Sequence, residues 1–298
     1  MAAMQGEPPA VARRRVRFAL RRYRAATGMN QSEVAKRLSW SLSKIQRIEG
    51  GEVAVSVTDL RALLDLFQVD DDAEVEKLVE DAEASRRQRW YEGPEYRAHL
   101  TKGLRQLLQF ESEAAEIRLY QPALVPGFLQ TPALADAVLR WWRTDLLSEE
   151  ARRVRYDVRM LRKSQILDRP DGPECYLILD ESVLMRKVGG AKVMGEQLES
   201  LLEVSRLPAV HVRIVPLDKG AHANLLGPFQ IINLVDGDDQ DAVLYREFYN
   251  RDSVTHDPAE LEFHREVFEA LWAMARDERD TQDAILKNSL ELRLSLEE

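Results

Sequence analysis

The stretch from Gln31 to Gly51, QSEVAKRLSWSLSKIQRIEGG, constrains the fold more than any other part of the chain. Two short helical patterns lie within it. Val34 and Leu38 are four residues apart, and Ile45 and Ile48 are three apart, so each pair shares one face of a helix. Only a short polar turn separates the two patterns. The stretch therefore predicts two short helices with apolar faces that pack together.

Three further features of this stretch favour a helix-turn-helix. Ala35 is small where a second helix must cross closely, and the Ser41 hydroxyl is placed to cap the second helix. Gly50-Gly51 is typical of a helix end. Two helices arranged in this way present the second one to the major groove of DNA. The alternative is a helical hairpin that has no nucleic-acid partner.

The stretch GMNQSEVAKRLSWSLSKIQRIEGG resembles the Xre/Cro-type helix-turn-helix family. The shared hallmarks are Gln31 at the start of the first helix, the small Ala35, and Ile45 to Glu49 followed by Gly51. Ser39-Trp40 departs from the family pattern, in which many members carry a glycine and a small aliphatic residue in the turn. The resemblance implies a five-helix bundle that binds DNA. The DNA contacts that we expect from it are Gln31, Ser41, Leu42, Ser43, Lys44 and Arg47.

Individual roles follow from side-chain chemistry. Gln31 is expected to contact a phosphate, Arg47 to bind a guanine edge through two hydrogen bonds, and Leu42 to touch a thymine methyl group. Glu49, at the end of the second helix, is expected to brace the motif rather than to read a base.

Charge is distributed unevenly along the chain. The net charge is −9, yet residues 10–68 contain 12 Lys and Arg against 5 Asp and Glu, which is +7 and leaves −16 for the rest. A basic N-terminal domain on an acidic body fits phosphate binding confined to one end. The first predicted helix carries many arginines, which are either a solvated face or, for some of them, phosphate contacts: Arg13, Arg14, Arg17, Arg21, Arg22 and Arg24.

Length and composition exclude several classes of protein. The 298 residues are enough for two domains. A single cysteine, Cys175, excludes an intrachain disulfide framework and a zinc site built from several cysteines. No stretch approaches the roughly 18 apolar residues of a membrane helix, and the N-terminus lacks the apolar core of a secretory signal. The sequence therefore predicts a cytoplasmic protein with no membrane partner.

The predicted fold class is mainly α followed by α+β. We expect a disordered tail at 1–9, a helix-turn-helix domain at 10–84, an α+β regulatory domain with a small sheet at 85–276, and a charged tail at 277–298. Ser56, Ser148 and Asp257 are predicted to cap helices, and residues 100–117 are predicted to be helical. The expected strands are Cys175–Leu179, Val210–Val215, Phe229–Val235 and Ala242–Tyr245.

The segment YQPALVPGFLQT, residues 120–131, is too apolar for a surface linker. It is either a loop buried in the domain core or part of a groove for a partner or ligand. In the second case the contacts would come from Leu124, Val125, Phe128 and Leu129. His222 follows a predicted strand in a loop, a position where functional residues are common, and it is a further candidate for such a site.

Three segments of the C-terminal region resemble one family. LYQPALVPGFLQT, LDESVLMRKVGG and the run from Pro208 to His222 resemble the large C-terminal domain of WhiJ-like, Scr1-type regulators. The resemblance implies an antitoxin-like transcriptional regulator whose gene often neighbours one for a small partner protein. It supplies no ligand and no catalytic residue.

The sequence lacks the common motifs of enzyme active sites. None of the five histidines belongs to an H-E-x-x-H helix, and neither a P-loop nor a G-x-G-x-x-G motif is present. Cys175 at the start of a predicted strand is better explained as a small core residue than as a nucleophile. The sequence therefore predicts a protein that is no enzyme and holds no cofactor and no metal.

Together these features predict a sequence-specific transcriptional regulator. Of the two kinds of regulator, a repressor is favoured. It is expected to bind double-stranded DNA as a homodimer on a pseudo-palindromic operator with half-sites about 10 bp apart. The C-terminal domain would dimerise, bind a small partner protein encoded nearby, or both. The alternative is a small-molecule-sensing regulator with a ligand pocket in the C-terminal domain.

Overall fold

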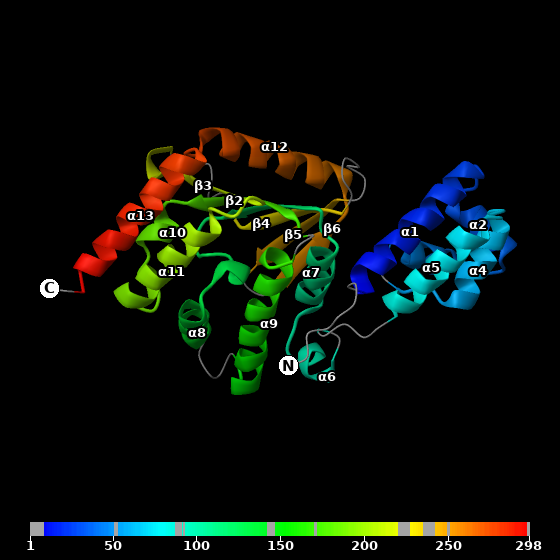
Figure 1. Cartoon of the computed structure of the whole chain (residues 1–298), viewed down its shortest axis with the longest axis horizontal. Helices are drawn as coiled ribbons and strands as arrows, with labels where there is room; N and C mark the ends of the chain where they lie inside the picture. Colours follow the sequence, from blue (N-terminus) through cyan, green and yellow to red (C-terminus); the bar gives the residue numbers. More distant parts are fainter. Residues whose placement is uncertain are drawn as a thin grey trace. The chain divides into compact units, whose positions relative to one another are not determined.

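The computed structural model describes residues 9–50, 53–86, 91, 93–141, 147–169, 172–219, 227–234, 242–248 and 251–296. The chain divides into two compact units, Met1–Gly93 and Pro94–Glu298. Figure 1 shows the helices and strands of both units. Within the described ranges, no helix is long and apolar enough to cross a membrane.

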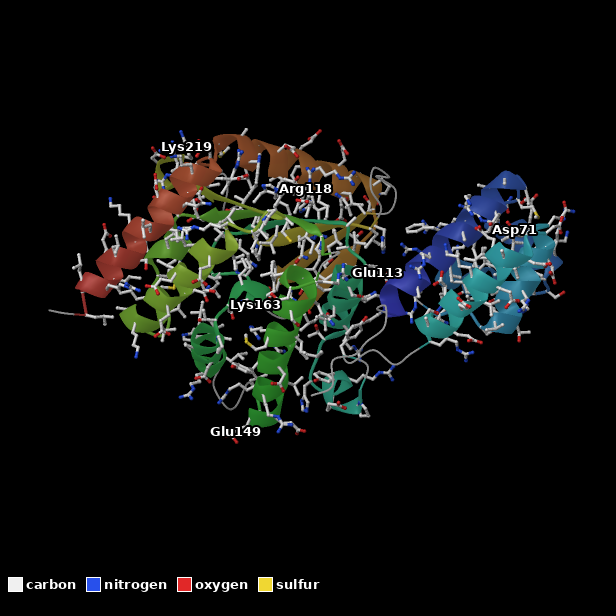
Figure 2. All side chains as sticks on the ribbon, in the orientation of Figure 1. Asp71, Glu113, Arg118, Glu149, Lys163 and Lys219 are labelled. Carbon is white, nitrogen blue, oxygen red and sulfur yellow. The ribbon has the colours of Figure 1, made fainter. Side chains whose placement is uncertain are left out.

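The described residues of the first unit form five helices, as predicted: α1 (Pro9–Ala26), α2 (Gln31–Arg37), α3 (Leu42–Glu49), α4 (Val57–Leu66) and α5 (Asp72–Ser85). Ser41 and Ser56 cap α3 and α4 by accepting hydrogen bonds from backbone N–H groups, which confirms both predicted caps. Asp71, labelled in Figure 2 at the start of α5, caps that helix in the same way. The capping residue of each of these helices therefore interacts with its near neighbours in the sequence.

Helix α5 is the last helix of the bundle, because its apolar face lies in the same core as α1. Leu78, Val79 and Ala82 of α5 are buried in one cluster with Val16 and Leu20 of α1. The rest of this cluster comes from α2, α3, α4 and the loop between α3 and α4. The bundle thus holds the two helices of the predicted motif against three others.

The second unit is an α+β domain, which confirms the predicted fold class. Its helices are α6 (Pro94–Arg97), α7 (Lys102–Ser112), η2 (Gly127–Leu129), α8 (Pro132–Trp141), α9 (Glu149–Leu167), α10 (Ser182–Met185), α11 (Ala191–Val204), η3 (Leu217–Lys219), α12 (Pro258–Met274) and α13 (Glu278–Leu294). Its strands are β1 (Glu116–Gln121), β2 (Glu174–Asp180), β3 (Val210–Val215), β4 (Phe229–Asn233), β5 (Ala242–Phe248) and β6 (Arg251–Thr255). The predicted caps Ser148 and Asp257 are confirmed at the starts of α9 and α12.

The six strands form one mixed sheet in the order β3-β2-β1-β4-β5-β6. Strands β1, β2 and β3 are parallel, and β4, β5 and β6 continue the sheet antiparallel. The register places Leu119, Leu177 and Val212 abreast on the three parallel strands. All three side chains are buried in the larger core cluster.

Helices cover both faces of the sheet. Helix α12 lies over one face, and α7, α8, α9 and α11 lie on the other side (Figure 1). Because successive strand residues point to opposite faces, Leu119 joins the larger cluster while its neighbour Tyr120 joins the cluster under α12. The unit is therefore a three-layer arrangement with two cores.

Two strands differ from the prediction. Residues 116 and 117 were predicted to end a helix, yet Glu116–Gln121 is strand β1 in the middle of the sheet. The alternation of Ile117 and Leu119 with Glu116 and Arg118 is a strand signal that the preceding helical pattern masked. Strand β6 was not predicted, because an edge strand such as RDSVT carries little apolar signal.

The predicted charged tail at 277–298 is corrected, because residues 278–294 form a helix that packs within the second unit. Glu278–Leu294 forms helix α13, which Asp277 caps at its start. Ile285 and Leu292 of this helix are buried in the larger core cluster, beside residues of α11. The charged residues occupy the solvent side of the helix, so the composition of this segment hid a buried face.

Candidate nucleic-acid interface

The turn between α2 and α3 has the geometry of a helix-turn-helix. Ser39 adopts a left-handed backbone with φ 56° directly after α2, and the backbone N–H of Trp40 donates to Ala35 O at 2.8 Å. Glycine favours that conformation, which explains why glycine is the common residue of the related family at the position of Ser39. Ala35 is 4% exposed at the contact between the two helices. The substituted turn therefore keeps the expected path of the chain.

Helix α3 exposes one polar face. Ile45 and Ile48 are 1% and 5% exposed, whereas Leu42 is 40% exposed. The predicted contact residues Ser41, Ser43 and Arg47 are also exposed. Their helical spacing gathers the exposed side chains along the side of α3 that is turned away from the core.

Gln46 belongs to this face and was missed by the sequence analysis. It is exposed, and it lies four residues after Leu42 and three after Ser43, so the same helical spacing brings it beside them. A glutamine can bind adenine through two hydrogen bonds in the major groove. The spacing rule alone was sufficient to find it.

Glu49 braces the motif, as the sequence analysis expected. Its carboxylate is buried and accepts two hydrogen bonds from Arg24 of α1, Nε to Oε1 at 2.7 Å and Nη2 to Oε2 at 2.9 Å. Gln31 Nε2 donates to Glu49 Oε2 at 2.7 Å. Glu49 thus links α1, α2 and α3. The Gln31 side chain, which is predicted to contact a phosphate, is held by this network.

Lys44 has partners within the protein. Its Nζ lies 2.8 Å from Asp59 Oδ1 of α4 and 3.6 Å from the ring centroid of Trp40. Lys44 thus has partners on α4 and in the turn, and its expected contact with DNA stays a prediction. Its charge is neutralised by Asp59, so this residue orients α3 against α4 and the turn.

Several arginines of α1 bind acids of the same unit, which limits their role as phosphate contacts. Arg15 forms an ion pair with Asp81 of α5, Arg22 lies 2.7 Å from Glu74 of α5, and Arg24 is bound by Glu49. Residues 10–84 contain 13 Lys and Arg and 13 Asp and Glu, so the eight acids and one lysine of residues 69–84 cancel the basic excess of residues 10–68. Lys36 and Arg37 at the end of α2 and Arg47 of α3 are exposed cations of the motif itself.

The proposed groove residues of the second unit lie mostly in its core. Val125, Phe128 and Leu129 are 3%, 0% and 1% exposed, whereas Leu124 is 38% exposed. Of the two alternatives for this segment, the burial agrees with a loop packed in the domain core, because buried side chains offer no surface to a partner. His222 lies outside the described residues.

Comparisons with known families agree with this division. A family model described as a helix-turn-helix domain matches residues 16–78, so the first unit is a helix-turn-helix domain of the kind found in DNA-binding regulators. A second family model, described as a domain of unknown function (DUF5753), matches residues 104–287. The protein belongs to this DUF5753 family. No curated protein and no solved structure gave a significant match.

Proposed function

We propose that the protein is a sequence-specific transcriptional repressor of the Xre type, antitoxin-like in its C-terminal domain. The observation that carries the proposal is the exposed polar face of α3, a helix that Glu49 and Lys44 connect to α1, α2 and α4. A rigid helix with exposed hydrogen-bonding side chains is suited to reading base edges in a major groove.

In this proposal, Arg47 binds a guanine, Gln46 an adenine, and Leu42 a thymine methyl group. Ser43 lies on the same face, while Ser41 and the backbone N–H at the start of α2, next to Gln31, approach phosphates. We propose no catalytic role for the protein. In support, Cys175 is 0% exposed, and burial raises the pKa of its thiol to about 12, so it remains an inert thiol.

Replacing Arg47 with alanine is expected to weaken binding to the cognate duplex by about 1–3 kcal/mol and to relax one base position, because two hydrogen bonds to one base are lost. The duplex is obtained by selecting a random DNA library with the full-length protein. Titration of that duplex and of its single-base variants, followed by fluorescence anisotropy, measures both effects.

Arg61→Ala is the matched control, because Arg61 is an exposed arginine of α4 that pairs with Glu76. It is expected to bind the selected duplex like the unaltered protein. An equal loss for Arg47→Ala on selected and scrambled duplexes would show that Arg47 contacts only phosphate.

We also propose a homodimer that forms through α13. Leu286, Leu290 and Leu294 follow one another at spacings of four and are 44%, 49% and 63% exposed. A straight apolar stripe on one helix is complementary to itself around a two-fold axis, and Lys287 and Glu291 beside it offer opposite charges to a second copy. A single helix-turn-helix covers too little DNA for tight specificity, which favours a dimer.

Replacing Leu290 with lysine is expected to produce a monomer. Each dimer would lose two buried leucines worth about 1.5–3 kcal/mol each, so its dissociation constant should rise at least about 100-fold. Analytical ultracentrifugation across a dilution series measures this constant. The control is Leu217→Lys, an equally exposed leucine of η3 at 49%, and a monomeric starting protein would contradict the proposal.

A small partner protein encoded nearby remains part of the proposal, with Leu124 as the exposed residue of the loop that could contact it. The alternative, a small-molecule sensor, is favoured by a cluster of charged side chains in the second unit. That cluster lies along α9, outside the helix-turn-helix unit.

A further inference from the structure

Helix α9 carries four arginines on one face. Arg152, Arg155, Arg159 and Arg162 follow at spacings of three, four and three, so they form a stripe about 15 Å long. Glu149 and Lys163, labelled in Figure 2, mark the beginning of this helix and the region near its end. Four cations along one helix face repel one another unless anions neutralise them.

The protein neutralises Arg162 fully. Its Nε and Nη2 atoms donate to the two carboxylate oxygens of Glu111 at 2.8 and 2.6 Å, and Gln230 Nε2 donates to the same carboxylate at 3.1 Å. Glu111 is buried. This pair is therefore a closed structural unit, with no charge left for another ligand.

Unlike Arg162, Arg159 and Arg155 are not paired with a carboxylate of the residues that the structure describes. Arg159 Nε donates to the neutral amide oxygen of Gln130 at 3.1 Å, and its Nη1 donates to the backbone oxygen of Arg155 at 2.9 Å. The amide of Gln130 is itself fixed, because its Nε2 donates to Val125 O at 2.9 Å. Among the described residues, no carboxylate forms an ion pair with Arg155 or Arg159.

The surroundings of Arg159 make its positive charge unfavourable. Burial, and then the neighbouring charges of Arg162 and Arg155, lower the pKa of Arg159 to about 10, although Glu247 acts in the opposite direction. The Nε atoms of Arg152 and Arg155 are buried without a hydrogen-bond acceptor in the described part of the chain. Buried donors of this kind are costly when they stay unpaired.

The loop before α8 closes one side of the cluster. A side-chain carbon at Gly127 of η2 would lie 3.3 Å from Arg162 Nη1 and 3.7 Å from Arg159 Cγ, so glycine allows the loop backbone to approach the arginines. Arg155 and Arg159 are only partly buried, so both side chains keep some solvent-accessible surface.

We infer that Arg155 and Arg159, oriented by Gln130, form a binding site for the oxyanion group of a small ligand, either a phosphate or a carboxylate. A guanidinium binds both groups through short, charge-assisted hydrogen bonds. This site is where the ligand would bind if the protein is a small-molecule sensor. It concerns the second unit alone, so its test is independent of DNA binding.

The test uses the full-length protein in Tris chloride at constant ionic strength. Inorganic phosphate, pyrophosphate and citrate are titrated separately, with chloride as the reference, and binding is followed by the midpoint of thermal unfolding and by calorimetry. A saturable rise of the midpoint is expected for one of these anions by mass action. The stronger of the phosphate and citrate responses identifies the preferred oxyanion.

Arg155→Gln and Arg159→Gln are expected to weaken anion binding at least about tenfold, whereas Arg153→Gln, on the exposed side of the same helix, should not change it. Without added anion, Arg155→Gln should unfold at the same temperature as the unaltered protein or at a higher one, because a repulsion is removed. A purely structural Arg155 would instead lower that midpoint. Small, unsaturable shifts that are alike for all anions and all variants would overturn the inference.

Discussion

Replacing Glu111 with alanine is expected to destabilise the second unit by about 3–5 kcal/mol. Glu111 accepts both hydrogen bonds of the Arg162 guanidinium, and the two side chains are 4% and 12% exposed. Its loss leaves a buried cation without a partner beside Arg159, and Gln230 loses its acceptor as well. Hydrogen exchange measured by mass spectrometry reports this loss segment by segment, on peptides from α7, α9 and β4.

Two further variants separate charge from packing. Asp136→Ala removes an exposed ion pair of α8, and it should change the free energy of unfolding by no more than about 1 kcal/mol. The double variant Glu111→Leu with Arg162→Met should recover most of the loss, because replacing both partners leaves no uncompensated charge. A cost below about 1 kcal/mol for Glu111→Ala would mean that Arg162 is not buried as the structure has it.

Replacing Glu49 with alanine is expected to cost about 3 kcal/mol in the first unit and to weaken binding to every DNA sequence. The estimate is the lower end of the range for buried pairs, since Arg24 is 21% exposed while Glu49 is 5% exposed. The change releases Arg24 and Gln31 together, so α3 loses its connection to α1 and α2. Exchange protection of α1 to α3 and the anisotropy titration measure the two effects.

Glu76→Ala is the matched control for Glu49→Ala in the same unit. Glu76 pairs with Arg61 on the surface, with both side chains about half exposed or more, and its removal should cost between about 0 and 1 kcal/mol. Intact DNA binding by Glu49→Ala would show that the reading helix keeps its orientation without the brace.

The elements that could be predicted are those whose signals are local. Ser41, Ser56, Ser148 and Asp257 each cap a helix through a backbone N–H three residues further along. The apolar spacing of α3 likewise placed Ile45 and Ile48 in the core. These signals need no knowledge of the rest of the chain.

The charged residues could not be assigned in the same way, because their partners are distant in the sequence. Arg15 binds Asp81, and Arg162 binds Glu111, pairs separated by 66 and 51 residues. Sequence reasoning treats such arginines as a solvated face, and only the packing of α1 on α5 or of α9 on α7 shows which acid each one meets. The ion pair of Lys44 could not be predicted for the same reason, since Asp59 lies on another helix.

The buried face of α13 was not predicted from the sequence, for a different reason. Its buried residues include the polar Thr281 and Ser289, which weaken the apolar period on which a helix face is recognised. The Thr281 hydroxyl accepts a hydrogen bond from the Ile214 N–H of β3 at 3.1 Å. A polar residue with such a partner can be part of a core, yet its residue type predicts exposure.

The central claim is that α3 reads a DNA sequence, and one measurement tests it most directly. The full-length protein is titrated against the duplex that it selects from a random library and against a scrambled duplex, at several salt concentrations. We predict a pseudo-palindromic selected sequence, a preference of at least about 10³-fold over the scrambled duplex, and an affinity that falls steeply with salt for both. Equal affinity for the two duplexes, or no enriched sequence in the selection, would contradict it.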